Sequence, residues 1–390
     1  MFKIRTYNQI SHVGLGRFPL DRYRVGPDIE DPNALVLRSH KLHDEPIADS
    51  VIAVARAGAG VNNIPVEACS RRGIVVFNTP GANANAVKEI VTAALLLSSR
   101  RIVAGMNRVQ ELTDFQDAEA LAKQLEKEKK AYGGSEIIGR TLGVVGLGAI
   151  GSLVANSALD LGMRVVGFDP GLSVEGAWRL SSRVERMDSL EALLNESDFV
   201  TLHVPAVEST HHLIDATTLT RFKPGATLLN FARATVVDAE AVVKALDEGL
   251  LGGHITDFPI PAMLGRDDCQ LLPHLGASTA EAEENCSVMA AEQLKDFLEN
   301  GNIVNSVNFP QTRMGRAGGS RITFANVNVP KVLGSVLSIL ADNDYNVIDM
   351  VNKSRNELAY NIIDIEGEPT AEVVAAIGRV EGVKQLRVLP

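Results

Sequence analysis

Short apolar runs alternate along most of the chain with longer stretches in which apolar residues recur at helical spacing. In the first hundred residues the runs are ALVLRS, VIAVARAG and GIVVFNTP, and from Thr141 to Asp257 they are TLGVVGLG, RVVGFD, DFVTLHVP, ATLLNFA and GGHITD. Strands that alternate with helices imply parallel sheets with right-handed crossovers. The pattern therefore predicts two doubly wound α/β domains.

The last seventy residues follow a different order. We expect strand 321–329, helix 331–342, strand 346–353, strand 358–366, helix 370–378 and strand 383–389, which is the βαββαβ order of a ferredoxin-like module. A long amphipathic helix that ends at Asn300-Gly301 precedes this module. The stretch QTRMGRAGGSR between them is Gly-rich and basic, as a linker is. The charged stretch QDAEALAKQLEKEKKAYGG predicts a solvated helix.

Composition and charge restrict the possible partners. A chain of 390 residues is too long for a single core. Its net charge of −10 argues against nucleic-acid binding, which needs a basic face. Three scattered cysteines, no apolar leader segment and no apolar run of membrane length predict a cytoplasmic protein that contacts no membrane. No metal site is expected, because the adjacent His211 and His212 should diverge and lack further ligands.

A glycine motif follows the apolar strand in LGVVGLGAIG. Gly146 suits a tight turn, Gly148 the close approach of a pyrophosphate, and Gly151 the packing of helix on strand. The following helix directs free N–H groups at the phosphates. Asp169, about twenty residues further on, ends the next strand and would accept the ribose hydroxyls. A carboxylate there repels a 2′-phosphate, so the motif predicts a Rossmann domain that binds NAD.

Further motifs follow in a fixed order: KPGATLLNFARATVVDAEAV, GGHITDFP and LLPHLGASTAEAEENC. This set resembles the D-isomer-specific 2-hydroxyacid dehydrogenases. Three further parts of the chain resemble the members of that family that act on 3-phosphoglycerate. They are LVLRSHK, ARAGAGVNNIPVEACSRRGIVVFNTPGANANAV and the terminal module. The resemblance implies NAD-dependent oxidation of D-3-phosphoglycerate to 3-phosphohydroxypyruvate, the first step of L-serine biosynthesis.

The resemblance also assigns roles to residues. His274 would be the acid–base group and Arg233 would orient the substrate, roles that suit an imidazole that titrates near neutrality and a planar guanidinium. Besides the glycines and Asp169, the family places cofactor contacts at Thr79, Ala149, Ile150, Val204, Phe231, Ala232, Asp257, Gly276 and Ala277.

Two segments could hold the substrate's anionic groups. Arg38, Ser39 and Lys41 stand at a strand end and form a plausible phosphate clamp, although the two cations could also be ordinary surface charges. The loop from Gly58 through Ala59 to Gly60 offers consecutive backbone N–H groups for a carboxylate. The expected cleft lies between an NAD-binding domain, 99–281, and a substrate-binding domain, 1–98 with 282–310.

One departure from the family pattern concerns the partner of His274. The family's glutamate falls on Ala262, so the customary carboxylate is absent. Three alternatives remain open. Asp267 or Asp268 replaces it, Asp257 serves both the cofactor and the histidine, or His274 works unpaired with a less stabilised cation. The glycine that usually follows the motif arginine is Ala234.

The terminal module, 321–390 after the linker 311–320, resembles an ACT domain. Such domains pair edge to edge between subunits and bind L-serine as an inhibitor, which implies a homo-oligomer, dimer or tetramer, with a possible serine site at Asn326, Asn328 and Asn346. Lys331 replaces the family's glycine in the expected ligand turn. Two other functions stay open: a dehydrogenase for another D-2-hydroxy acid, and a non-catalytic regulator that senses NAD.

Overall fold

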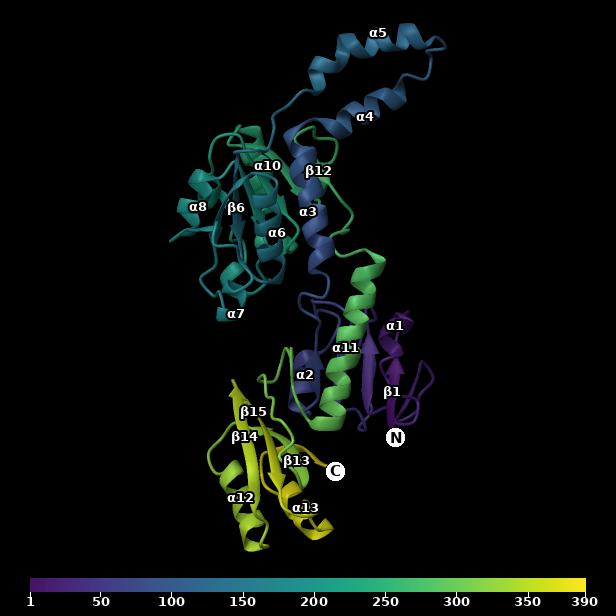
Figure 1. Ribbon diagram of the computed structural model, residues 1–390, viewed down its shortest axis with the longest axis vertical. Coiled ribbons are helices and arrows are strands. Elements are labelled where there is room, and N and C mark those ends of the chain that lie inside the picture. The colour runs from purple at the N-terminus through teal and green to yellow at the C-terminus, as the bar shows by residue number, and fades with distance from the viewer. The chain divides into compact units, whose positions relative to one another are not determined.

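The computed structural model describes residues 1–174 and 176–390 and contains two compact units. Unit 1 comprises Met1–Asn83 and Ala280–Pro390, and unit 2 comprises Ala84–Thr279 (Figure 1). Each contains a parallel sheet, which confirms the predicted α/β class with Rossmann-like sheets. Helix α3 (Ala84–Ser99) belongs to unit 2.

The parallel sheet of unit 1 has the strand order β2-β1-β3-β4-β5. Strands β3 and β5 are continuous apolar runs, and β4 is apolar up to Arg56, because both faces of the sheet are covered. Helix α11 buries Cys286, Ala290, Leu294 and Phe297, at helical spacing, in the same core as Phe77. The elements are β1 (Phe2–Thr6), α1 (His12–Leu15), β2 (Tyr23–Gly26), β3 (Ala34–Leu37), β4 (Ala53–Arg56), α2 (Val66–Arg71), β5 (Val75–Phe77) and α11 (Ala280–Asn300).

The C-terminal module of unit 1 is an antiparallel sheet of order β14-β15-β13-β16 with two helices on one face (Figure 1). Its elements confirm the predicted βαββαβ order: β13 (Ser320–Val327), α12 (Val332–Asp342), β14 (Val347–Arg355), β15 (Leu358–Ile365), α13 (Ala371–Gly378) and β16 (Val383–Leu389). The opposite face contributes Ala325, Tyr360 and Ile362 to the core that contains Phe297 and Phe309. The module and the parallel sheet of unit 1 therefore share one hydrophobic core.

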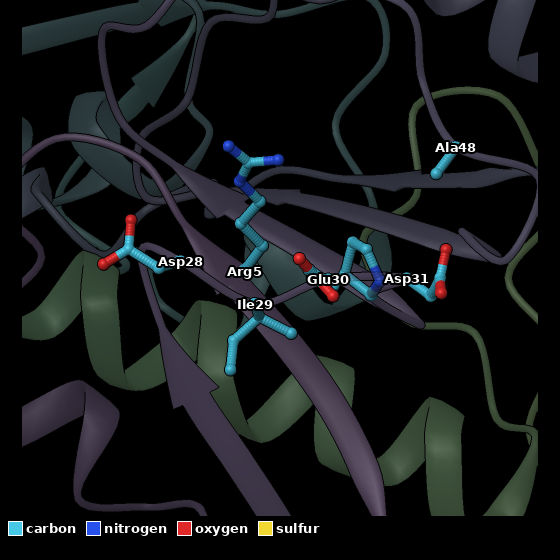
Figure 2. Close-up of a pocket in the computed structure, with 7 residues that line it drawn as sticks. Arg5, Asp28, Ile29, Glu30, Asp31 and Ala48 are labelled. Atoms are coloured by element: carbon cyan, nitrogen blue, oxygen red, sulfur yellow. The ribbon is translucent and has the colours of Figure 1, made fainter.

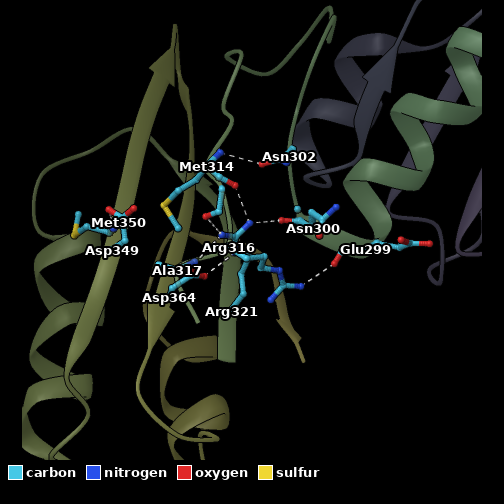
Figure 3. A network of polar contacts seen from close by, with 12 residues as sticks. Glu299, Asn300, Asn302, Met314, Arg316, Ala317, Arg321, Asp349, Met350 and Asp364 are labelled. Atoms are coloured by element: carbon cyan, nitrogen blue, oxygen red, sulfur yellow. Dashed lines mark hydrogen bonds and ion pairs between the residues drawn. The ribbon is translucent and has the colours of Figure 1, made fainter. Parts of the chain in front are cut away.

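A buried ion pair anchors the segment that joins this module to α11 (Figure 3). Arg321 and Asp364 are fully buried and form two hydrogen bonds, with Nε to Oδ1 at 2.6 Å and Nη2 to Oδ2 at 2.8 Å. The same guanidinium donates to the carbonyl oxygens of Asn300, Met314 and Gly315. Residues 311–320, predicted as a linker, are thus bound to both neighbouring elements.

Unit 2 has a seven-stranded parallel sheet of order β12-β11-β10-β9-β6-β7-β8. The strands are β6 (Thr141–Val145), β7 (Arg164–Phe168), β8 (Glu185–Arg186), β9 (Phe199–Leu202), β10 (Ala226–Asn230), β11 (Leu251–Thr256) and β12 (Cys269–Leu271). From β6 the strand order continues through β7 and β8 on one side and through β9, β10, β11 and β12 on the other. The topology therefore reverses direction at β6, next to the glycine motif. In such sheets ligands bind at the carboxyl ends of the strands beside this switch point.

Helices and short 3-10 turns connect these strands. The helices besides α3 are α6 (Ala149–Asp160), α7 (Val174–Ala177), α8 (Leu190–Glu196), α9 (Ala216–Leu219) and α10 (Ala239–Asp247), and the turns are η1 (Lys129–Tyr132), η2 (Glu208–Thr210), η3 (Ala234–Val236) and η4 (Pro261–Met263). Helices α4 (Ile102–Glu111) and α5 (Ala118–Glu128) extend away from the sheet and bury no residue, so the predicted solvated helix is confirmed (Figure 1).

One expectation about side chains is wrong. The rings of His211 and His212 are stacked, with centroids 4.1 Å apart, instead of diverging. The reason is that both lie in a turn and His212 has a φ of 48°, so the alternation of a strand does not apply. Among the described residues there is no cluster of three or more His, Cys, Asp or Glu side chains placed to hold a metal ion. No helix in the described ranges is long and apolar enough to cross a membrane.

Candidate active site

The glycine turn of unit 2 has the geometry that a dinucleotide requires. Gly146 has a φ of 89°, and a Cβ there would lie 2.8 Å from the carbonyl of His203. A Cβ on Gly151 would collide with the carbonyl oxygen of Gly146, whereas a Cβ on Gly148 would extend into open space. That open space is where a pyrophosphate approaches the backbone in Rossmann domains. The turn therefore fits NAD.

The helix that follows the turn has an unsatisfied N-terminus. Gly148 is the N-cap of α6 and provides no side-chain cap, so Ala149 and Ile150 begin the helix with N–H groups available to an anion. Asp169 follows β7, and its two carboxylate oxygens accept hydrogen bonds from Leu147 N at 2.8 Å and Gly171 N at 2.9 Å. These bonds hold the Asp169 carboxylate, which is predicted to bind the ribose hydroxyls, directly beside the glycine turn.

Arg233 follows β10, and the side chain of Asn230 holds its backbone. Asn230 donates from Nδ2 to the carbonyl of Arg233 and accepts at Oδ1 from Ala232 N, each at 3.1 Å. The Arg233 guanidinium is half-buried and donates to the carbonyl of Ala232, and burial lowers its pKa below the ordinary value. No ion pair of Arg233 occurs within the described residues, so its fork is available to an anionic substrate. Phe231 and Ala232 are buried behind it.

His274 lies on an exposed loop that Asp257 holds in place. The buried Asp257 carboxylate accepts hydrogen bonds from Leu275 N at 3.0 Å and from Gly276 N at 2.7 Å. His274 itself has a φ of 57°, a left-handed conformation that is uncommon for a non-glycine residue. Its ring packs edge-on against Phe258, with centroids 5.0 Å apart. Ala277 follows in the same loop and is half-buried.

The acids considered as partners of His274 are bound elsewhere in unit 2. Asp267 pairs with Arg101 at 2.8 Å, and Asp268 forms two bonds to Arg266, each of 2.8 Å. Both line a hollow of about 510 Å³ together with these arginines, and His274 is not part of its lining. The two oxygens of Asp257 each accept a backbone N–H group, and no bond between Asp257 and His274 is present among the described residues. As far as the described residues go, His274 therefore forms no ion pair within unit 2.

Two other histidines of unit 2 are unsuited to acid–base work. Burial lowers the pKa of His203 to about 3, and its Nε2 is hydrogen-bonded to Thr201 Oγ1 at 3.0 Å. Burial likewise lowers the pKa of His254 to about 4. Both are neutral near pH 7. Val204, beside His203, packs against the glycine turn, since a Cβ on Gly146 would lie 3.0 Å from its Cγ1.

In unit 1 the segment after β3 carries the predicted phosphate clamp. Asn8 Oδ1 accepts from Ser39 N at 3.2 Å and from His40 N at 2.7 Å. From the other side, Asn63 Nδ2 donates to the carbonyls of Arg38 and His40 at 3.2 and 2.7 Å. Lys41 is exposed. The two asparagines thus fix the backbone of the clamp.

The Arg38 side chain forms an ion pair with Glu283 of α11, with Nη1 and Oε1 2.6 Å apart. Sequence reasoning missed Asn8, Asn63 and Glu283, because they are distant along the chain and only the topology of unit 1 brings them to Arg38. The single available signal was that an asparagine can bridge N–H and C=O groups of a turn.

The loop after β4 lies beside this clamp. Arg56 donates from Nε to the carbonyl of Arg38 at 3.0 Å, and a Cβ on Gly58 would lie 2.5 Å from Arg56 Nη1. The Gly58 N–H is used by the carbonyl of Arg56. Within the described residues, the N–H groups of Ala59 and Gly60 form no backbone hydrogen bond. Of the three consecutive N–H groups predicted to bind a carboxylate, these two are therefore available. Thr79, which donates its N–H to the carbonyl of Gly58, is fully buried in unit 1.

Of the predicted effector asparagines, Asn326 and Asn328 form internal side-chain bonds and Asn346 a backbone bond. Asn326 donates to the carbonyl of Val327 at 2.6 Å and accepts from Asn361 at 2.7 Å. Asn328 donates from its side chain to the carbonyl of Asn356 at 3.1 Å. The carbonyl of Asn346 accepts from Glu366 N at 2.9 Å. Asn326 is buried in the sheet, so an effector would have to break an existing bond to reach its amide.

A further hollow of about 470 Å³ lies in unit 1 (Figure 2). Asp28, Glu30 and Asp31 line it beside Arg5, whose guanidinium donates from Nε to the carbonyl of Pro27 at 3.1 Å. None of the predicted site residues belongs to this lining. It is therefore separate from the clamp and from the loop after β4.

Comparison with known proteins finds a matching family model and named relatives. The family model described as D-isomer specific 2-hydroxyacid dehydrogenase, NAD binding domain, matches residues 93–276. The chain is 32% identical to D-3-phosphoglycerate dehydrogenase of Haemophilus influenzae over 385 residues, which cover 95% of this chain and 90% of that protein. It is 36% identical to the Synechocystis enzyme of the same name over 72% of this chain, and spans 50% of that relative.

Solved structures show the same fold. The NAD-bound 3-phosphoglycerate dehydrogenase of Entamoeba histolytica has a TM-score of 0.61 at 24% identity, covering 79% of this chain and 98% of that one. D-mandelate dehydrogenase of Rhodotorula graminis has a TM-score of 0.65 at 22% identity and covers 78% of this chain. At these identities the likeness concerns the fold alone.

Proposed function

Since the chain belongs to the D-3-phosphoglycerate dehydrogenases, a branch of the D-isomer-specific 2-hydroxyacid dehydrogenases, we propose that it oxidises D-3-phosphoglycerate to 3-phosphohydroxypyruvate with NAD. This is the first step of L-serine biosynthesis. One observation carries the proposal. The glycine turn, Asp169, Arg233 and Asp257 all follow the carboxyl ends of strands of one parallel sheet, and Asp257 binds the His274 loop to that same edge.

The residues of unit 2 divide the chemistry. The glycine turn, the N-terminus of α6 and Asp169 would hold NAD, which would supply the hydride acceptor for the oxidation at C2. His274 Nε2 or Nδ1 takes the proton of the C2 hydroxyl, and returns it in the reverse direction. Arg233 binds the substrate carboxylate through its planar fork and places a positive charge beside the C2 oxygen.

The residues of unit 1 supply anion binding. In the proposed function, Arg38 and Lys41 bind the phosphate with Ser39, and the N–H groups of Ala59 and Gly60 bind the carboxylate. The Arg38 backbone is fixed by Asn63 and Arg56, so only its side chain has to adjust to the ligand.

We further propose that His274 works without a carboxylate partner. The hydrogen bonds of Asp257, Asp267 and Asp268 support this alternative over the two others. Asp257 then acts through the backbone of the loop rather than through the imidazole.

A substrate panel with NADH tests the proposed function. Phosphohydroxypyruvate should be reduced with a higher kcat/KM than hydroxypyruvate, pyruvate or 2-oxoglutarate. If a non-phosphorylated acid gives the highest value, the chain is a dehydrogenase for that D-2-hydroxy acid. If no 2-oxo acid oxidises NADH, the proposal of an enzyme is wrong and the chain is better explained as a non-catalytic regulator that senses NAD.

For the C-terminal module we propose an ACT domain that pairs edge to edge between subunits and so makes the protein a homo-oligomer, dimer or tetramer. The exposed edge strand β14 supports pairing, because only one of its sides is hydrogen-bonded in the described sheet. L-Serine is the proposed effector, and an activity curve that stays flat across a wide serine titration would remove it. Location in the cytoplasm remains a prediction from the sequence.

A further inference from the structure

The ion pair between Arg38 and Glu283 introduces a negative charge at the proposed phosphate clamp. Nη1 of Arg38 and Oε1 of Glu283 are 2.6 Å apart, and Arg56 bonds to the Arg38 carbonyl beside them. Glu283 lies in the first turn of α11, so the helix fixes its position. One donor of the Arg38 fork is therefore already occupied by an anion.

This ion pair contributes little to the stability of unit 1. The side chains of Arg38 and Glu283 are 38% and 44% exposed, and ion pairs in contact with water contribute little to stability. The backbone of the clamp is already held by Asn8, Asn63 and Arg56. The main effect of Glu283 is therefore on the binding of ligands to the Arg38 guanidinium and not on the stability of unit 1.

A phosphate ester carries about two negative charges at pH 7. To bind Arg38 it must share the fork with Glu283 or displace it, and in both cases the two anions repel each other. A ligand without a phosphate has no group to place at Arg38 and does not meet this repulsion. The carboxylate therefore weakens binding of phosphorylated ligands selectively.

We propose that Glu283 is a specificity-determining residue that lowers the affinity of the Arg38 clamp for doubly charged phosphate esters. The inference rests on the proposed function, because it takes Arg38 as the phosphate ligand. In the catalytic cycle this charge raises the KM for the phosphorylated substrate and speeds release of the phosphorylated product.

The test compares Glu283→Gln, which keeps the shape and removes the charge, with Glu284→Gln, which removes a charge from an exposed neighbour on the same helix turn. The KM for phosphohydroxypyruvate should fall about three- to tenfold in Glu283→Gln and stay unchanged in Glu284→Gln. The KM for hydroxypyruvate should change less than about twofold in both. The effect should shrink at high ionic strength, which screens exposed charges.

An unchanged or raised KM for phosphohydroxypyruvate in Glu283→Gln would overturn the proposal, and a raised value would mean that Glu283 orients Arg38. Failure of the proposed function gives a different result, in which the wild-type protein reduces hydroxypyruvate but not phosphohydroxypyruvate. In that case inorganic phosphate, used as an inhibitor against hydroxypyruvate, still tests the clamp: its Ki should fall in Glu283→Gln, and an unchanged Ki contradicts the role of Glu283.

Discussion

Asp257 shows at the scale of one residue how a carboxylate predicted as a cofactor contact also shapes the chain around it. The resemblance places this carboxylate on the nicotinamide carboxamide, and its two oxygens also accept the N–H groups of Leu275 and Gly276. Those bonds hold His274 at a φ of 57°. A residue that acts through the backbone of the loop is a positioning residue, and it should affect stability even without cofactor.

We therefore expect Asp257→Asn to lower the free energy of unfolding of the cofactor-free protein by about 2 kcal/mol, because one buried N–H group then faces an amide NH₂. The kcat should fall at least about tenfold, since the acid–base loop loses its anchor. Chemical denaturation and steady-state kinetics measure the two effects. Asp267→Asn, at an exposed ion pair, should cost under about 0.5 kcal/mol. Unchanged stability with weaker NADH binding would instead favour a cofactor contact alone.

Lys331 occupies a position that suits glycine. Its φ is 79° at the N-cap of α12, in the left-handed region where a side chain costs about 1–2 kcal/mol. Lys331→Gly should therefore stabilise the protein by about 1 kcal/mol after the extra chain entropy of glycine is subtracted. Ser335→Gly, inside the same helix, should destabilise it by roughly 0.5 kcal/mol. A lower midpoint of denaturation for Lys331→Gly would contradict the claim that the positive φ of Lys331 destabilises the protein.

Much of the site's residue chemistry could be predicted from the sequence, and some could not. The glycine turn follows from local geometry, because a positive φ and two close approaches restrict Gly146 and Gly151 to glycine. The environment of His274 could not be predicted, because Asp267 and Asp268 are adjacent in sequence but bind different arginines. Asp268 meets Arg266 within the same turn, whereas Asp267 meets Arg101 from a distant part of the chain, and periodicity encodes neither contact.

At the scale of elements, the Arg321–Asp364 pair joins strands β13 and β15 to the end of α11. Burial alone would raise the pKa of Asp364, but hydrogen bonds from Arg321 and from Ala317 N outweigh it and hold the pKa below its ordinary value. A carboxyl with a lowered folded-state pKa stabilises the fold above its ordinary pKa of about 3.9 and loses this contribution as the pH falls below it.

The free energy of unfolding of the wild-type protein should accordingly decrease as the pH falls below about 4. Asp364→Asn should cost about 3 kcal/mol at pH 7, because Arg321 is left as a buried unpaired charge, and should show a flatter pH dependence in the acid range. Denaturant titrations at several pH values measure both effects. Asp49→Asn, which removes a fully exposed partner of Arg72, should match the wild type. An equal acid slope in Asp364→Asn would refute the role of this pair.

The order of elements was predictable where hydrophobic periodicity is strong. The βαββαβ order of residues 320–389 and the end of α11 at Asn300 agree with the structure. The periodicity could not show that the face of the C-terminal sheet opposite its helices is buried against the rest of unit 1. Ala325, Tyr360 and Ile362 pack against Phe297 and Phe309, so the face is a core and not an exposed surface.

At the scale of the whole molecule, the two units carry different parts of the proposed site. Unit 2 contains the glycine turn, Arg233 and His274, and unit 1 contains the loops after β3 and β4 that we propose bind the anionic groups. The order of the motifs along the chain indicated these positions, because parallel α/β sheets place functional loops at strand ends. The shared core of the C-terminal module and α11 could not be foreseen, since the Gly-rich stretch between them resembles a free linker.

The central claim is that this chain catalyses NAD-dependent oxidation of 3-phosphoglycerate with His274 as the acid–base group. The most direct test is the rate of NAD reduction by 3-phosphoglycerate in the wild-type protein and in His274→Ala, with NADH affinity measured by fluorescence as the control for an intact cofactor site. We expect turnover in the wild type, a loss of about 100- to 10,000-fold in kcat in His274→Ala, and NADH affinity within about threefold. No turnover in the wild type, or near-normal turnover in His274→Ala, would contradict the claim.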